Sequence, residues 1–305
     1  MEGLLRKTFR ALGTVNTIIV PDTCSDALQK AAQRVLELDD RFSAFKEDSE
    51  ISRINQAAGL NFVKVHSDTF GIIKSALRFS QLSEGTFDIS ARPLVELWGI
   101  GKKGNWVPSP GEIAARKQLV DFRDIILDEK AESIMLRRPL QALDLGGIAK
   151  GYAADEVRRI LLESGCKDAL INLGGTVITL GAPRTVGIQD PRKEAGIPMG
   201  KLQITNCSLV TSGSYEKYFI RDGIRYHHII DPRTGSPACS ELLGVTLIGD
   251  SAMELDALST AVFILGIQKG VQLLEKSGIE AVFIDESFDV FTTPGLRENF
   301  KLIRT

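Results

Sequence analysis

One stretch constrains the fold of this chain more than any other, the segment Ala142–Asp155 with the sequence ALDLGGIAKGYAAD. A short apolar run enters two adjacent glycines, Gly146 and Gly147, and leaves as a helix that carries Lys150. Glycine has no Cβ, so the backbone can turn sharply and approach a ligand closely there. A helix that begins after such a turn directs unpaired N–H groups and a partial positive charge outward. The pattern is typical of a phosphate site, although an ordinary strand-to-helix corner has the same form.

Hydrophobic periodicity along the rest of the chain predicts an α+β fold, because helical and strand patterns are interspersed and many strand pairs are hairpins. Helices are expected over residues 25–42, 68–82, from 110 onward, from just after the Gly146-Gly147 turn to about 164, and over 252–265 and 267–277. Short strands are expected over residues 15–20, 125–127, 133–136, 169–173, 176–180, 185–188, 202–204, 209–211, 215–220, 225–230, 242–248 and 281–284. Residues 43–55 form a polar stretch that interrupts the helical pattern, and residues 85–94 are too irregular for a helix. No linker or repeat divides the 305 residues, so a single domain spanning 1–305 is predicted.

Composition limits the function classes. The net charge is −2 and basic residues are scattered, which gives no electrostatic footprint for nucleic acid. We expect no transmembrane segment, because no stretch approaches about 20 apolar residues. The N-terminal residues lack a signal-peptide pattern and Cys24 is not in a lipobox, which predicts a cytoplasmic protein as written, or an exported one if a signal precedes it. The four cysteines lie far apart, so buried thiols are expected rather than zinc ligands or disulfides.

Several nucleotide motifs are absent or out of context. The segment 99–104 matches G-x-G-x-x-G, but it follows a Leu-Trp pair and precedes Asn-Trp-Val-Pro, so we reject it as a dinucleotide fingerprint. No G-x-x-x-x-G-K-[ST] loop and no G-x-S-x-G elbow occurs. Ordinary ATP-dependent phosphoryl transfer is therefore disfavoured.

Two further groups of residues are candidates for metal binding and catalysis. Asp256 and Thr260 are spaced i, i+4 on an apolar helix, hence on one face, and two oxygen ligands one turn apart suit Mg²⁺; a capping or solvated face is the alternative. His227 and His228 precede a Pro-Arg-Thr-Gly turn, and only one of two adjacent strand residues can face a given site. Such a histidine is either a surface residue or a general base.

Taken in order, these motifs resemble the ApbE-type flavin transferases. The resemblance covers nearly the whole chain and is carried by these segments: 11–14 (ALGT), 42–45 (FSAF), 49–55 (SEISRIN), 87–90 (FDIS), 93–99 (PLVELWG), 144–151 (DLGGIAKG), 172–175 (NLGG), 212–216 (SGSYE), 228–235 (HIIDPRTG) and 256–260 (DALST). Each motif is short, but eight or more in the right order are specific.

The resemblance implies a T-fold-like α+β structure and an enzyme that uses FAD as substrate together with Mg²⁺. Members transfer the FMN half of FAD to a threonine or serine hydroxyl of an acceptor flavoprotein and release AMP. It further implies that Asp256, Thr260 and the carbonyl of Gly147 are metal ligands, and that His228 is the base. The FAD-contacting positions that it implies are Leu12, Phe45, Thr86, Phe87, Asp88, Asp144, Lys150 and Ile230.

Two other functions use the same residues. A Mg²⁺-dependent FAD pyrophosphatase would replace the protein hydroxyl with water and give FMN and AMP. A flavin-binding protein without turnover would leave FAD whole. The sequence does not identify the acceptor protein or the oligomeric state.

Overall fold

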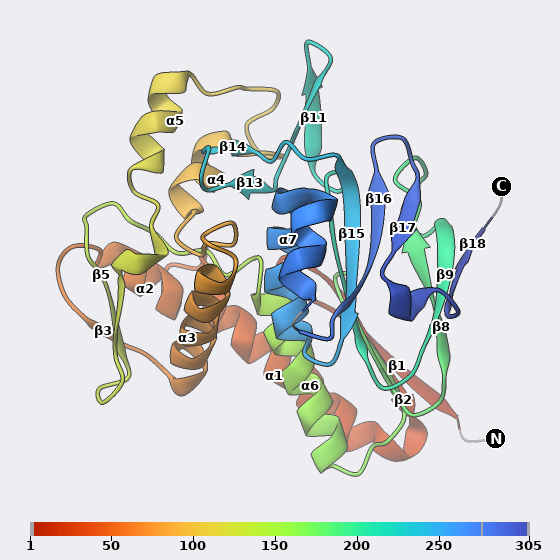
Figure 1. Ribbon diagram of the computed structural model, residues 1–305. Helices are drawn as coiled ribbons and strands as arrows, with labels where there is room; N and C mark the ends of the chain where they lie inside the picture. Colours follow the sequence, from red (N-terminus) through yellow and green to blue (C-terminus); the bar gives the residue numbers. More distant parts are fainter. Residues whose placement is uncertain (1–2, 276, 304–305) are drawn as a thin grey trace. The chain divides into compact units, whose positions relative to one another are not determined.

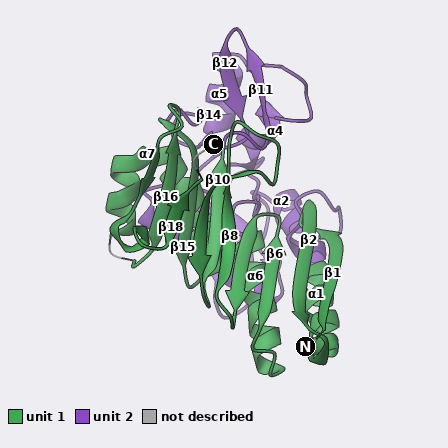
Figure 2. Cartoon of the chain, turned by 90° about the vertical axis from the view of Figure 1, so that its right-hand side faces the viewer, with its two compact units in different colours: residues 1–37, 150–213, 241–305 green, residues 38–149, 214–240 purple. Residues whose placement is uncertain are grey.

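A computed structural model describes residues 3–275 and 277–303 of the chain (Figure 1). Its contacts group the chain into two compact units, which Figure 2 colours separately. Unit 1 comprises Met1–Glu37, Lys150–Gly213 and Glu241–Thr305, and unit 2 comprises Leu38–Ala149 and Ser214–Ser240. The single domain expected over residues 1–305 stays a prediction.

Unit 1 is built on an eight-stranded antiparallel sheet. In spatial order its strands are β1 (Leu4–Ala11), β2 (Thr14–Pro21), β6 (Ala169–Leu173), β7 (Thr176–Leu180), β10 (Ser208–Gly213), β15 (Leu242–Gly249), β16 (Glu280–Asp285) and β17 (Val290–Thr292). Three helices belong wholly or largely to this unit: α1 (Ser25–Phe42), α6 (Ala149–Glu163) and α7 (Ala252–Leu274). A second, three-stranded sheet holds β8 (Arg184–Gln189), β9 (Pro198–Ile204) and β18 (Phe300–Leu302).

Strand β15 lies between two layers. Helix α7 packs on it and on β10, while apolar residues of β8 and β9 form a cluster with Leu209, Ile248 and Val282 of the large sheet (Figure 1). Seven of the eight β15 residues are buried, and only Gly249 is partly exposed. Strand β2, in contrast, alternates between buried and more exposed residues. A continuous apolar run is therefore what a strand covered on both faces requires.

Helix α7 is one helix with a break, where the sequence predicts two. Gly266 has φ +79° and ψ −178°, which is not helical, so the expected boundary between 265 and 267 is present inside a continuous element. Among the described residues, α7 is the one helix long and apolar enough to cross a bilayer by length and composition, although no such stretch was expected. More than half of its most apolar window is buried inside the protein, as in the core helix of a folded domain.

The expectation of unpaired cysteines is wrong for two of the four. Cys24 and Cys166 form a disulfide with a Cα–Cα distance of 5.8 Å, within the range that a disulfide requires. The two residues are 142 positions apart in the sequence. They meet because the turn before α1 lies beside the end of α6, and spacing along the chain carries no trace of that proximity.

Unit 2 combines short helices with three small sheets. Its helices are α2 (Glu50–Gln56), α3 (Ser67–Leu82), α4 (Arg92–Trp98) and α5 (Pro110–Lys117). Its strands are β3 (Val63–Lys64), β4 (Ile125–Asp128), β5 (Ser133–Leu136), β11 (Tyr218–Arg221), β12 (Ile224–His227), β13 (Ile230–Asp231) and β14 (Ser236–Pro237). The expected hairpins β4–β5 and β11–β12 are both present. A core of Leu94, Trp98 and Ile230 lies between α4 and β13.

The α+β class is confirmed, while several elements were missed. These are β1, α2, β3, α4, β14, β17 and β18. Strand β1 is mostly exposed on one side, and α2 and α4 each have seven residues, so none of them offers a long apolar period to recognise. Segment 99–104 begins at Gly99, which ends helix α4 in a left-handed conformation, so it does not follow a strand.

Candidate active site

The residues implied by the resemblance are distributed over both units. Unit 1 contains Leu12, Lys150, Asp256 and Thr260. Unit 2 contains Phe45, Thr86, Phe87, Asp88, Asp144, Gly147, His228 and Ile230.

Asp256 and Thr260 lie on the first half of α7. The helix begins at an N-cap, Ser251, whose hydroxyl accepts the N–H of Glu254 at 3.3 Å. Asp256 is only 4% exposed, which is unusual for a carboxylate, and Thr260 one turn later is partly exposed. A carboxylate and a hydroxyl are thus held on one helix face, as predicted.

Two groups of helix α6 stabilise the negative charge of the buried Asp256 carboxylate. The backbone N–H of Gly151 donates to its Oδ2 at 2.9 Å, and Lys150 Nζ lies 3.2 Å and 3.4 Å from its two oxygens. A buried carboxylate requires such partners, because an uncompensated charge would cost several kcal/mol. Lys150 and Asp256, separated by more than a hundred residues, are therefore neighbours within unit 1.

This donor set suits a hard divalent cation. Carboxylate and hydroxyl oxygens are ligands that Mg²⁺ accepts, and Mg²⁺ completes its shell with water and substrate phosphate. Within residues 3–275 and 277–303, no three His, Cys, Asp or Glu side chains gather in a metal-binding group. The predicted site contains one carboxylate, one hydroxyl and one backbone carbonyl, so it does not require such a group of three.

Leu12 has an unusual backbone conformation. It lies with Gly13 in the two-residue turn between β1 and β2, and both have positive φ, +53° and +70°. Positive φ at both central residues is typical of a type I′ hairpin, in which Asn or Gly usually takes the first position. A leucine there is strained, and its side chain is held at the tip of the hairpin.

In unit 2, Asp144 organises the glycine turn. Its Oδ1 accepts the N–H of Gly146 at 2.7 Å, and its own N–H donates to Ile89 O at 2.8 Å. Just before the turn, the side-chain amide of Asn55 donates to Leu143 O at 3.1 Å and accepts the N–H of Leu143 at 2.7 Å. Neither Gly146 nor Gly147 has a positive φ. The chain therefore turns here without the left-handed conformation that glycine permits. Asp144 thus shapes the turn in addition to any contact it makes with a ligand.

Phe45 stands in a cationic environment that sequence reasoning missed. Phe45 is 67% exposed, and the charged groups of Arg92 and Lys102 lie 4.8 Å and 4.0 Å from its ring centroid. Arg92 Nη1 is also 3.7 Å from Asp144 Oδ2. An exposed aromatic ring beside two cations can stack on a planar heterocycle and attract phosphate. The sequence offered no signal for Arg92, because its contacts join segments distant along the chain.

Thr86, Phe87 and Asp88 differ in accessibility. Thr86 and Phe87 are 1% and 4% exposed, and the Thr86 hydroxyl donates to Ser83 O at 2.8 Å. Asp88 is partly buried and accepts hydrogen bonds from Ser90 N, Ser90 Oγ and Phe122 N. Burial raises the pKa of Asp88 to about 6, since desolvation outweighs these bonds.

Asp88 lines a cavity of about 410 Å³ that lies entirely in unit 2. Its wall also contains three cations, Lys117, Arg123 and Arg233, and two further acids, Glu84 and Asp121, with Pro232 and Phe122 as apolar surface. Acids and cations are thus equal in number along this wall, which together with the raised pKa of Asp88 suits a polar ligand that carries hydrogen-bonding groups.

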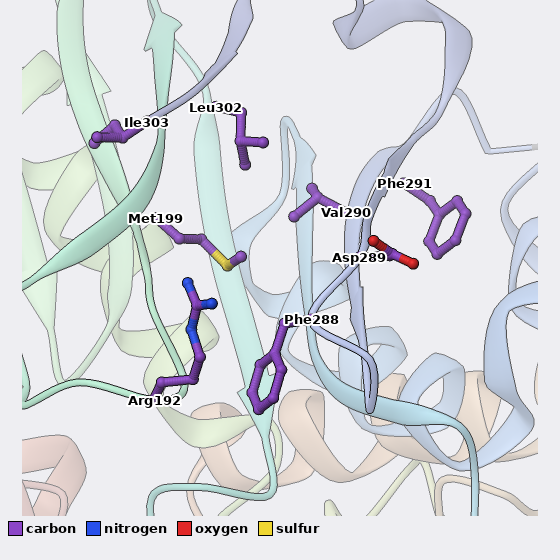
Figure 3. Close-up of a pocket in the computed structure, with 8 residues that line it drawn as sticks. All are labelled: Arg192, Met199, Phe288, Asp289, Val290, Phe291, Leu302 and Ile303. Atoms are coloured by element: carbon purple, nitrogen blue, oxygen red, sulfur yellow. The ribbon is translucent and has the colours of Figure 1, made fainter. Parts of the chain in front are cut away.

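A larger cavity, of about 640 Å³, lies in unit 1 and contains none of the predicted residues (Figure 3). It is lined by Arg192, Met199, Phe288, Asp289, Val290, Phe291, Leu302 and Ile303, and the Arg192 guanidinium lies 5.1 Å from the Phe288 ring centroid.

The two adjacent histidines have different environments. His227 is 5% exposed and bonds Ala238 O through Nε2 at 3.0 Å; burial lowers its pKa, so it is neutral. His228 is partly exposed, and its Nδ1 lies 3.3 Å from Lys217 O. A carbonyl oxygen can only accept, so we assign the proton to Nδ1, which leaves the lone pair on Nε2. Ile230 is 7% exposed and belongs to the core of unit 2.

The fold and these residues define an α+β protein with a buried acid–hydroxyl pair on a core helix and a cation-rich surface around an aromatic ring. The family model of the ApbE family matches residues 12–283. The chain belongs to the ApbE family, as its motifs indicated.

Relatives with a named function match most of this chain. It is 40% identical over 274 residues to a protein of Klebsiella pneumoniae named FAD:protein FMN transferase, covering 88% of this chain and 86% of that protein. A protein of the same name from Treponema pallidum is 35% identical over 280 residues, with 86% and 77% covered.

Solved structures agree with the fold. The ApbE protein of Thermotoga maritima has a TM-score of 0.89 at 31% identity and covers 97% of this chain and 99% of its own. The flavin transferase ApbE of Vibrio cholerae has a TM-score of 0.88 at 25% identity, with 98% and 100% covered. The predicted ApbE-like fold is thereby confirmed.

Proposed function

We propose that this protein is an FAD:protein FMN transferase, which moves the FMN half of FAD to a threonine or serine of an acceptor flavoprotein. Family membership and the names of the relatives support the reaction. The observation that carries it at the level of the site is Asp256, a 4% exposed carboxylate beside Lys150 and one helical turn before Thr260. A protein that only stores flavin has no need for a buried acid placed in this way.

The reaction is a phosphoryl-group substitution at the FAD pyrophosphate. The acceptor hydroxyl oxygen forms a bond to the phosphorus of the FMN half, the bond from that phosphorus to the bridging oxygen breaks, and AMP leaves. His228 Nε2 takes the hydroxyl proton, while Nδ1 keeps its hydrogen bond to Lys217 O. The fixed Nδ1 contact selects the tautomer that can act as base.

We propose Mg²⁺ as the metal of this reaction. When bound, it would neutralise charge on the pyrophosphate. In unit 1, Asp256 and Thr260 would hold it, and Lys150 would add a positive charge next to them. The third ligand implied by the resemblance, the carbonyl of Gly147, stays a prediction.

We propose that Phe45, Asp88 and Asp144 contact FAD in unit 2. Phe45 offers an exposed ring beside Arg92 and Lys102, and Asp88 lines the polar cavity of unit 2. The side chains of Thr86, Phe87 and Ile230 are buried, so their proposed contacts would use backbone atoms or require the site to open. Leu12 in unit 1 would present its side chain to FAD from the tip of the β1–β2 hairpin, where its backbone has positive φ.

We also propose that the protein folds in an oxidising compartment. The Cys24–Cys166 disulfide supports this, because such bonds persist where thiols are not kept reduced.

The deciding experiment incubates the purified protein with FAD, Mg²⁺ and candidate acceptor flavoproteins, and follows AMP by chromatography and acceptor peptides by mass spectrometry. We expect AMP in step with an FMN adduct on a threonine or serine peptide. Release of AMP with no adduct on any acceptor would replace the transferase with an FAD pyrophosphatase, and FAD left whole would indicate a binding protein.

A matched variant tests the metal role in the same assay. Asp256→Ala should abolish Mg²⁺-dependent turnover while changing the dissociation constant for FAD much less. Equal turnover by this variant would remove Asp256 from the site.

A further inference from the structure

Helices α6 and α7 of unit 1 approach each other unusually closely at Gly151. A Cβ at this position would lie 2.2 Å from Ala252 O and 2.6 Å from Ala252 C. No side chain fits in that space, so only glycine permits the contact. The same residue donates its N–H to Asp256 Oδ2. The position of α7 along α6 therefore sets where the Asp256 carboxylate lies.

Asp155 fixes that position from α6. It lies four residues after Gly151, on the same helix face. Its Oδ1 accepts the N–H of Ala252 at 3.0 Å, and its Oδ2 accepts the N–H of Met253 at 3.0 Å and the hydroxyl of Ser251 at 3.1 Å. These backbone donors belong to the first turn of α7, where helices have no internal acceptors.

Arg158 strengthens the junction. Its Nη2 pairs with Asp155 Oδ1 at 2.8 Å, and its Nη1 donates to Asp250 O at 2.6 Å, directly before the N-cap of α7. A carboxylate at a helix N-terminus also interacts favourably with the helix dipole. The start of α7 is thus held by side chains of α6 in addition to its own N-cap.

Fixing the first turn of α7 also fixes Asp256, because Asp256 lies only one helical turn after Ala252. An α-helix transmits a shift of its first turn to the next as a rigid rod, and a ligand carboxylate must be held to within a fraction of an ångström. We propose that Asp155 is a positioning residue: by clamping the first turn of α7 to α6, it holds the Asp256 carboxylate in the orientation that binds the metal. This inference rests on the proposed function, because it assigns a purpose to the metal site of that function.

The test measures metal binding directly. Mn²⁺ titrated into the full-length protein without FAD, followed by electron paramagnetic resonance, reports a dissociation constant that does not depend on turnover. We expect Asp155→Ala to weaken Mn²⁺ binding about tenfold and to raise the Mg²⁺ concentration for half-maximal turnover by the same factor. Turnover should recover at saturating metal, with the KM for FAD changed less than about threefold.

Two further variants separate positioning from folding. Asp155→Asn keeps one acceptor oxygen and should restore part of the metal affinity. Glu163→Ala is the matched control, since Glu163 is another acid of α6 that pairs with an arginine of the same helix, Arg159, but is exposed and lies at the opposite end of α6 from Gly151. The metal affinity of this variant should equal that of the wild type. If Asp155→Ala does not fold, the Mn²⁺ dissociation constant of Asp155→Asn tests the positioning role instead.

The outcomes are distinct. Wild-type affinity in folded Asp155→Ala, or in Asp155→Asn if the alanine variant unfolds, would overturn the positioning role and leave the proposed function intact. A wild-type protein that binds no Mn²⁺, or that binds it no more tightly than Asp256→Ala does, would overturn the metal site itself and this inference with it.

Discussion

At the scale of single residues, His227 and His228 show how neighbours in sequence acquire different tasks. The strand β12 ends at His227, which points into unit 2 and bonds Ala238 O, whereas His228 is partly exposed and bonded through Nδ1 to Lys217 O. One histidine is a structural hydrogen-bond donor and the other has its basic nitrogen oriented by a carbonyl. Their substitution should therefore affect different quantities.

We expect His228→Ala to lower the transfer rate by about 10²–10⁴-fold with the FAD affinity largely kept, since loss of a general base acts on the chemical step. His227→Ala should instead lower the free energy of unfolding by about 1–3 kcal/mol, because it leaves Ala238 O without its buried donor. Single-turnover assays and urea unfolding measure the two effects. An unchanged rate in His228→Ala would exclude it as the base.

Asp88 makes the stability of unit 2 depend on pH. Its pKa is raised from 3.8 to about 6 by burial, so the folded state binds more protons than the unfolded state between these values. The free energy of unfolding therefore falls as pH rises through this window, and the contribution of protonated Asp88 is lost above about pH 6.

Asp88→Asn removes this titration. Lowering the pH from 7 to 4 should stabilise the wild type relative to the variant by about 1–3 kcal/mol, the value expected for a shift of about two pKa units on a partly solvated group. Urea unfolding at several pH values measures the difference. Curves for the two proteins that stay parallel would contradict the burial of a protonated Asp88.

At the scale of elements, two helical glycines, Gly151 in α6 and Gly71 in α3, differ in the space around them because α7 packs closely against α6. Gly151 would place a Cβ 2.2 Å from Ala252 O, whereas a Cβ at Gly71 in α3 would meet nothing within 4 Å. Helix propensity alone favours alanine over glycine at both positions by about 1 kcal/mol. Only tertiary contact makes them differ.

We expect Gly151→Ala to lower the free energy of unfolding by about 1–3 kcal/mol, since α7 must move away to accept the methyl group. Gly71→Ala, the same substitution in an open helix, should raise it by about 0.5–1 kcal/mol. Thermal and urea unfolding of both variants provide the comparison. A stabilising Gly151→Ala would mean that the helices separate at no cost, and that they are not tightly joined there.

At the scale of the whole molecule, the Cys24–Cys166 bond closes a loop across 142 positions and ties the start of α1 to the end of α6. Closing a loop of this length restricts the unfolded chain, and loss of a native disulfide typically costs about 2–5 kcal/mol. The bond thus contributes a substantial part of the free energy that holds unit 1 folded.

Reduction should therefore lower the melting temperature of the wild type. The double variant Cys24→Ser/Cys166→Ser should melt at the temperature of the reduced wild type and be insensitive to reductant. Cys239→Ser, a change at an exposed free cysteine, should behave as the wild type does. A melting temperature that reductant leaves unchanged would show that the bond contributes nothing to stability, and would remove the support for an oxidising compartment.

Much of the secondary structure was predictable, because it depends on local patterns. Helix α1 has the predicted bounds 25–42, and the capping box of Ser109 and Glu112 begins α5 as expected. The elements that were missed are short or mostly exposed, as with α2 and β1, and such segments have too few buried positions to show a period. The α+β class and the family were thus available from sequence, and the exact set of elements was not.

The sequence by itself determined the chemistry that is available: a lysine after a glycine turn, an acid and a hydroxyl one helical turn apart, and a histidine before a Pro-Arg-Thr-Gly turn. These follow from residue type and local spacing. Only the tertiary structure decided that Lys150 pairs with Asp256, that Asp155 caps α7, that Arg92 lies over Phe45, and that two of the cysteines are joined. Each of these contacts joins residues far apart along the chain, and its energy depends on distance and burial, which no local pattern records.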